Sequence, residues 1–128
     1  LLNSNDLENL SKIELIREYI ANKSSDITSY NSDNKVDKSL LINGRNLTNI
    51  GVFRKYIESY VENHSAINKD LMVMARQLQP GDNGLPIEIY AFSSEKRWQN
   101  YEYIIADIFD HIIAASSTFD LEIYEHKF

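Results

Sequence analysis

The stretch Leu85–His111 constrains the fold more than any other part of the chain. From Leu85 to Ala91 every second residue is aliphatic, which is the period-two pattern of a β-strand. Ser93 and Ser94 follow with hydroxyls that could cap the N-terminus of a helix. Apolar residues then recur at helical spacing from Trp98 to Ile112. The stretch therefore predicts a strand, a turn and a long helix.

A second strand is predicted directly before the first. Asp70–Leu78 has the composition of a strand, and Gln79–Gly84 is rich in residues that tolerate turn geometry. The two segments therefore predict a β-hairpin with Leu85–Ser93. Folding the hairpin about Asp82 predicts its register: Arg76 opposite Glu88, Met74 opposite Tyr90, Met72 opposite Phe92, Ala75 opposite Ile89 and Val73 opposite Ala91.

One face of this predicted hairpin is unusually apolar. The opposite face carries small and branched residues, which suit a position under helices. The second face of an antiparallel sheet is normally polar and exposed to water, but here it is apolar. Either the faces are inverted, or the first helix covers the apolar one, or that face is an interface with another domain or subunit. We favour the interface, and its predicted residues are Met72, Met74, Tyr90, Phe92 and Tyr124.

The rest of the chain supplies helices and two further strands. Leu7–Tyr30 is predicted as one long amphipathic helix capped by Asp6, and a polar loop follows over 31–38. After a short apolar run over Ser39–Ile42 and a turn at Asn43-Gly44, a brief edge strand is expected over Arg45–Asn49. Thr48 or Asn49 can cap a second helix, which runs to about 63–64 and buries Val52, Phe53, Tyr56, Ile57, Tyr60 and Val61.

The last strand is predicted over Thr118–His126, where apolar and polar residues alternate again, and the long helix before it over Glu95–Ala115. After the first helix the expected order is therefore strand, helix, strand, strand, helix, strand. This order is that of a ferredoxin-like βαββαβ sandwich, an α+β fold. We expect residues 1–38 to form an N-terminal helix and linker, and residues 39–128 to form the ferredoxin-like domain.

Composition excludes several classes of function. The net charge is −6 and the 13 basic residues are scattered, so binding to nucleic acid or to anionic lipid is not expected. No run of about 18 apolar residues occurs, so no transmembrane helix is predicted within the chain. The chain has no cysteine, which excludes a disulfide framework and fits a reducing compartment. Because it starts with Leu, we expect a fragment of a longer protein.

One helical segment has the residue types of a reactive site. Asp107, Asp110 and His111 have the spacing that places two carboxylates and an imidazole on one helix face, as a metal or acid–base site could require. Nothing in the sequence brings His64 or His126 to the same place. Hydrogen bonds to the surroundings are therefore the preferred role for these three residues.

Other candidates have equally ordinary explanations. Glu88 has no paired base, so a role as general acid is not expected. The aromatic residues Trp98, Tyr101 and Tyr103 could stack a ligand, but at helical spacing they suit a core or an interface better. No catalytic residue, cofactor site or metal site is predicted.

Three blocks of the sequence resemble a known family of channels. They are Asn43–Val61 (NGRNLTNIGVFRKYIESYV), Met72–Ser93 (MVMARQLQPGDNGLPIEIYAFS) and Trp98–Ala114 (WQNYEYIIADIFDHIIA). These blocks resemble the C-terminal cytoplasmic part of mechanosensitive channels of the small-conductance (MscS) family, miniconductance YbdG-like branch. The leading segment Leu10–Ile20 (LSKIELIREYI) resembles the insertion that this branch carries before its α/β domain.

The resemblance implies a role in a tension-gated channel. The complete protein would be a channel of the inner membrane, a homo-oligomer and most simply a heptamer, with its transmembrane helices and a β-rich domain before Leu1. This chain would form part of the cytoplasmic vestibule and would not conduct. Tension would open the pore during hypo-osmotic shock and release ions and small osmolytes. The family has no catalytic residues to transfer, and it gives the apolar hairpin face a role in assembly.

Two other functions remain open from the residues alone. The chain could be a free-standing ferredoxin-like module that binds a small molecule or regulates a partner. It could also be a small enzyme that uses Asp107 and His111. Hydrophobic spans encoded upstream would favour the channel, whereas a metal or a deep pocket at these two residues would favour the enzyme.

Overall fold

The computed structural model describes residues 1–94 and 97–124, with residues 98 and 99 described by their backbone only. Two compact units form, Leu1–Val52 and Phe53–Phe128, and each is considered by itself. The division into a leading segment 1–38 and a domain 39–128 stays a prediction.

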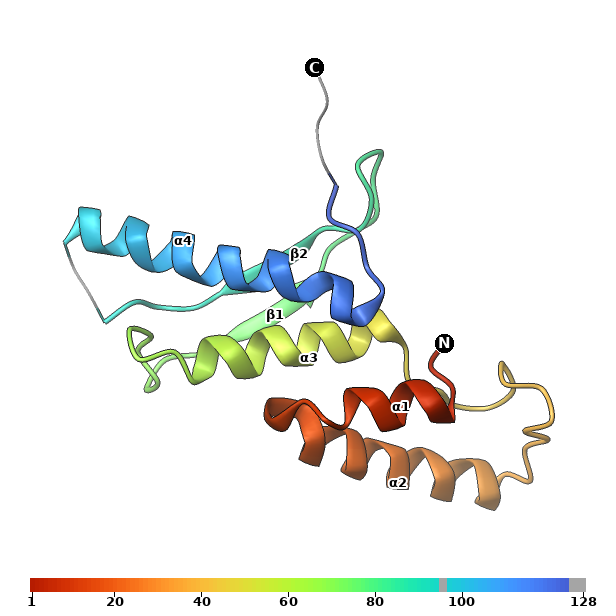
Figure 1. Cartoon of the computed structure of the whole chain (residues 1–128). Helices are drawn as coiled ribbons and strands as arrows, with labels where there is room; N and C mark the ends of the chain where they lie inside the picture. Colours follow the sequence, from red (N-terminus) through yellow and green to blue (C-terminus); the bar gives the residue numbers. More distant parts are fainter. Residues whose placement is uncertain (95–96, 125–128) are drawn as a thin grey trace. The chain divides into compact units, whose positions relative to one another are not determined.

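The first unit contains two helices in place of the single long helix expected over Leu7–Tyr30. Helix α1 (Ser4–Leu10) ends at a turn, η1 (Glu14–Ile16) is a short 3-10 helix, and α2 (Arg17–Asp33) follows directly (Figure 1). The expectation was wrong because the apolar residues from Leu7 to Ile16 are spaced by three. Three such steps rotate a stripe by about 180° around an α-helix, so one straight helix cannot bury both ends.

The start of α1 also differs from the expectation. Asn3, not Asp6, is the N-cap: its side chain accepts a hydrogen bond from the Asp6 N–H at 2.9 Å, and the Asp6 carboxylate accepts from the Asn3 N–H at 3.0 Å. This reciprocal pair is a capping box, with an Asp in the position where Glu or Gln is more usual. A capping box satisfies two backbone donors at once, which explains why the helix starts earlier than predicted.

No strand forms within 39–49, because a side chain takes the place of a strand partner. The amide of Asn31, which is 8% exposed, donates to the Arg45 carbonyl at 3.1 Å and accepts from the Arg45 N–H at 2.9 Å. The backbone N–H and C=O of Arg45, which would pair with a neighbouring strand, are therefore both hydrogen-bonded to Asn31 of α2. The loop is further held by the Lys38 ammonium, which donates to the carbonyls of Leu41 and Asn43 and to the Asn46 amide oxygen.

Helix α3 (Asn49–Glu62) agrees with the prediction. The Thr48 hydroxyl accepts a hydrogen bond from the Gly51 N–H at 3.1 Å, as an N-cap does. Its predicted apolar face is buried apart from Tyr60, which is partly exposed; the buried members are Val52, Phe53, Tyr56, Ile57 and Val61.

The second unit contains a two-stranded antiparallel sheet, β1 (Met74–Gln77) and β2 (Ile87–Tyr90). Its register confirms the prediction, with Met74 opposite Tyr90, Ala75 opposite Ile89 and Arg76 opposite Glu88. The hairpin end is closed by two hydrogen bonds between Gly81 and Gly84, each of 3.0 Å. The strands are shorter than expected, and the predicted pairs of Met72 with Phe92 and Val73 with Ala91 fall outside the ladder.

Helix α4 (Trp98–Ala115) and the 3-10 helix η2 (Ser116–Phe119) complete the described chain. The predicted residues Glu95 and Lys96 lie outside the described residues. Ser93 and Ser94 do not cap α4, whose N-cap residue Arg97 makes no side-chain capping bond. Instead the N–H and hydroxyl of Ser94 donate to the Ala66 carbonyl at 2.9 and 3.0 Å, which ties the end of the hairpin to the loop after α3.

The ferredoxin-like βαββαβ prediction is wrong. Within the described residues the sheet has two strands, and neither the first nor the last of the four predicted strands forms. At the C-terminal side, Phe119 is 2% exposed and packs its ring 5.0 Å from Phe53 and 5.4 Å from Tyr56. Asp120 then adopts a left-handed conformation (φ 56°) that ends η2, and residues 121–124 form no strand. The final residues of that predicted strand, 125 and 126, lie outside the described residues.

Candidate functional site

The predicted interface residues lie at the surface of the hairpin and of the segment after η2. Exposed fractions are 60% for Met72, 41% for Tyr90, 40% for Phe92 and 52% for Tyr124, and Met74 is partly exposed. By contrast Ala75, on the opposite face of β1, is 4% exposed. The hairpin therefore turns the small residue inward and the large apolar ones outward, as expected. Tyr124 belongs to a segment without regular secondary structure, not to a strand of this face.

Hydrogen bonds hold this apolar face in a defined shape. The Ala75 N–H donates to the Glu58 carboxylate of α3 at 3.2 Å, and the Asn68 N–H donates to the Phe92 carbonyl at 2.7 Å. The rings of Tyr90 and Phe92 meet edge to face, with their centroids 5.3 Å apart. Such a pair contributes about 0.5–1.5 kcal/mol beyond the area that it buries. The surface is thus an ordered aromatic patch.

Glu88, considered as a general acid, has a structural partner. It forms an ion pair with Arg76 at 3.0 Å across the two strands, as predicted from the register. Both side chains are well exposed, so the pair stabilises the sheet by less than about 1 kcal/mol. Tyr101 and Tyr103, both on α4, are 41% and 75% exposed. The side chain of Trp98 is not among those that the structure describes.

The Asp107–His111 segment of α4 meets side chains of α3 and of the loop after it. The His64 Nε2 lies 3.0 Å from the Asp107 carboxylate, and the Tyr56 hydroxyl lies 2.6 Å from the His111 Nε2. The His111 ring stacks on Tyr60 with 3.9 Å between centroids and 4° between planes. His64 therefore does converge with this segment, contrary to the expectation. His64 and Asp107 are 43 residues apart in the sequence, and no sequence pattern connects them.

The side chains of this cluster pack α3 against α4, and both ring nitrogens of His64 are hydrogen-bonded. The Ala66 N–H donates to the His64 Nδ1 at 3.1 Å, so that nitrogen carries no proton, and Nε2 is the donor to Asp107. Burial raises the pKa of Tyr56, and the neighbouring Tyr60 raises it further. Burial, and to a lesser degree Asp107, likewise raises the pKa of Tyr60. Both phenols therefore stay protonated at neutral pH and link α3 to α4 as neutral groups.

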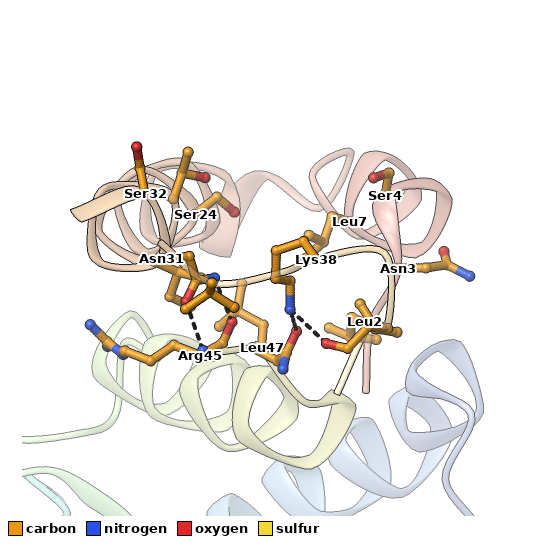
Figure 2. A pocket seen from close by; sticks show the side chains of 15 residues that line it. Leu2, Asn3, Ser4, Leu7, Ser24, Asn31, Ser32, Lys38, Arg45 and Leu47 are labelled. Atoms are coloured by element: carbon orange, nitrogen blue, oxygen red, sulfur yellow. Dashed lines mark hydrogen bonds between the residues drawn. The ribbon is translucent and has the colours of Figure 1, made fainter. Parts of the chain in front are cut away.

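The first unit contains a hollow that the sequence did not predict. Its volume is about 420 Å³, and it is lined by the start of α1, the second half of α2 and the loop that follows. Figure 2 shows Ser24 and Asn31 of α2 on one side, Leu7 of α1 on the other, and Lys38 between them. Asn31 and Arg45, which hydrogen-bond to each other, both line this space, and no local sequence pattern predicts their pairing.

In the part of the chain that the structure describes, no three metal-binding side chains come together, and no helix combines the length and apolar character needed to cross a bilayer. No protein-family model matches the sequence, and no solved structure matches the fold.

Proposed function

We propose that this chain is an assembly domain of the cytoplasmic vestibule of a tension-gated mechanosensitive channel of the MscS family. The complete channel would lie in the inner membrane as a homo-oligomer, most simply a heptamer. It would release ions and small osmolytes on hypo-osmotic shock. This domain would join subunits and would itself neither conduct nor catalyse.

The sequence resemblance and the structure support this proposal at the same places. The three resembling blocks coincide with defined elements: the loop and α3 over Asn43–Val61, the hairpin over Met72–Ser93, and α4 over Trp98–Ala114. They cover most of the second unit.

The apolar outer face of the hairpin is the observation that carries the proposal. An isolated two-stranded sheet is at best marginally stable in water, and exposed strand edges readily pair with other chains. Here the outward face adds Met72, Tyr90 and Phe92, each at least 40% exposed. A patch of this kind typically marks a protein interface. Repeated subunits around a ring would cover it.

The proposal is tested by making this face polar in the full-length channel. Met74→Ser combined with Tyr90→Ser should lower the oligomeric fraction measured by native mass spectrometry, because the contact loses apolar area. Patch-clamp recordings should then show fewer channels that open under tension. Tyr103→Ser is the control, since Tyr103 is 75% exposed and belongs to α4, not to the hairpin.

The far-ultraviolet circular dichroism of the 128-residue chain should be unchanged by the double substitution, which separates lost assembly from lost folding. A channel with normal oligomers and normal tension response after Met74→Ser and Tyr90→Ser would contradict the role of this face. The proposal also requires membrane-spanning helices encoded before Leu1. A coding sequence without them would contradict the channel itself.

A second candidate function has one observation in its favour. The hollow of the first unit gives the chain space for a small molecule, which suits a ligand-binding or regulatory module. This function does not exclude the first, because the hollow and the hairpin lie in different units. The upstream coding sequence distinguishes a free-standing module from a channel domain.

A further inference from the structure

We infer that the hollow of the first unit is a binding site for a small aliphatic carboxylate. This inference does not rest on the proposed channel function. It rests on four properties of the hollow: fixed walls, an apolar lining, an unpartnered hydroxyl and a positive charge without a counter-ion.

The walls are held in place by hydrogen bonds within the unit. Asn31 binds both backbone groups of Arg45, and the Leu2 N–H donates to the Leu47 carbonyl at 3.0 Å. Gly44 makes the first contact possible, because a Cβ at this residue would lie 2.4 Å from the Asn31 amide oxygen. A preformed site avoids the entropic cost of ordering its walls when a ligand binds.

Most of the surface that lines the hollow is apolar, as in most small-molecule sites, although polar residues contribute to it as well. A volume of about 420 Å³ lies within the range of such sites. The ligand should therefore have an aliphatic body. The apolar side chains that line the hollow are Leu2, Leu7, Ile27, Val36, Leu41 and Leu47.

One polar atom in the lining lacks a partner. The Ser24 hydroxyl is buried and makes no hydrogen bond within the described residues. Buried polar groups in folded proteins nearly always have a partner, and an exception calls for an explanation. Figure 2 shows Ser24 on the α2 wall of the hollow. A ligand oxygen in the hollow would satisfy this hydroxyl once the Ser24 side chain turns toward it.

The charges of the lining favour an anionic ligand. The residues that line the hollow include Lys38 and Arg45 but no Asp or Glu. The Lys38 ammonium is surrounded by three neutral oxygens, and it forms no ion pair within the described residues. Its positive charge is therefore not neutralised locally. A carboxylate in the hollow would be attracted to it, whereas an amine would be repelled.

Nuclear magnetic resonance titration of the 128-residue chain with three matched probes tests this inference. Hexanoate, hexanol and hexylammonium share an aliphatic body and differ in the charge of the polar end. Hexanoate should give saturable shifts at the amides of Ser24, Thr28 and Lys38. It should bind about fivefold more tightly than hexylammonium, which is the upper end of what one charge contact at a partly exposed site contributes.

Two substitutions sharpen the test. Lys38→Gln should weaken hexanoate binding about fivefold and leave hexanol binding unchanged, whereas Lys35→Gln removes the same charge outside the lining and should change neither. Ser24→Ala should weaken hexanoate binding several-fold by removing the donor.

If Lys38→Gln disrupts the loop, the probe comparison on the unaltered chain and the Ser24→Ala result still decide. Equal binding of hexanoate and hexylammonium would overturn the inference. So would equal effects of Lys35→Gln and Lys38→Gln, or the absence of saturable shifts around the hollow.

Discussion

At the scale of single residues, Asn31 and Gly44 decide the shape of the first unit. Asn31 is a polar residue in α2, and its side chain is buried, with 8% of the residue exposed. Its amide binds the backbone of Arg45, 14 residues later in the chain. Gly44 lies beside it with φ +70°, a conformation that residues with a Cβ rarely adopt. The two residues act together, because the amide reaches Arg45 only where no Cβ stands at residue 44.

Gly44→Ala should therefore destabilise the chain by about 2 kcal/mol or more, since it adds a left-handed strain of about 1–2 kcal/mol to a steric clash. Urea denaturation measures this change in the free energy of unfolding. Gly81→Ala is the matched control, because a Cβ there would meet nothing within 4 Å. Equal stability of the two variants would show that the Asn31–Arg45 contact is not maintained in solution.

At the scale of secondary structure, the elements that formed as predicted are those with local causes. Helix α3 has an N-cap, an apolar face at helical spacing and an end at a polar segment, all within Thr48–His64. The hairpin has alternating strands and a glycine-closed turn. The register with Arg76 opposite Glu88 could be derived from these features alone.

Thr48→Ala should lower the free energy of unfolding by about 1 kcal/mol, because the Gly51 N–H loses the acceptor that caps α3. Thermal unfolding followed by circular dichroism would detect the change. Thr48→Ser keeps the hydroxyl and should recover most of the stability. If Ala and Ser variants unfold at the same temperature, the hydroxyl does not cap the helix.

At the scale of the whole chain, the core of the second unit is closed by Phe119. This ring joins Phe53 and Tyr56 of α3 from a position beyond α4, and it is 2% exposed. The tyrosine–histidine contacts of α3 with His111 lie beside it in the same helix pair. The core of the second unit is therefore stabilised by contacts between residues that are far apart in the sequence.

Phe119→Ala should cost about 3–5 kcal/mol, because it removes a buried ring and leaves a cavity. Denaturant unfolding of the isolated chain gives the value. Phe109→Ala is a control on α4, where the ring is 48% exposed, and should cost much less. A loss below about 1 kcal/mol for Phe119→Ala would show that this ring does not close the core of the unit in solution.

The sequence by itself determined the elements whose causes lie within a few residues, namely α3 and the hairpin with its register. It left open which of Thr48 and Asn49 caps α3, and whether the face of Met72, Tyr90 and Phe92 points outward. Only the tertiary structure decided the rest. Asn31 took the hydrogen bonds that an edge strand at Arg45 would have used, and Phe119 entered the core where a strand was expected. The meeting of His64 with Asp107 joins residues 43 positions apart. Periodicity records which face of an element is apolar. It does not record which residue will hydrogen-bond a given backbone group or cover a given ring. Distant segments compete for those positions, and the outcome is decided only in the folded chain.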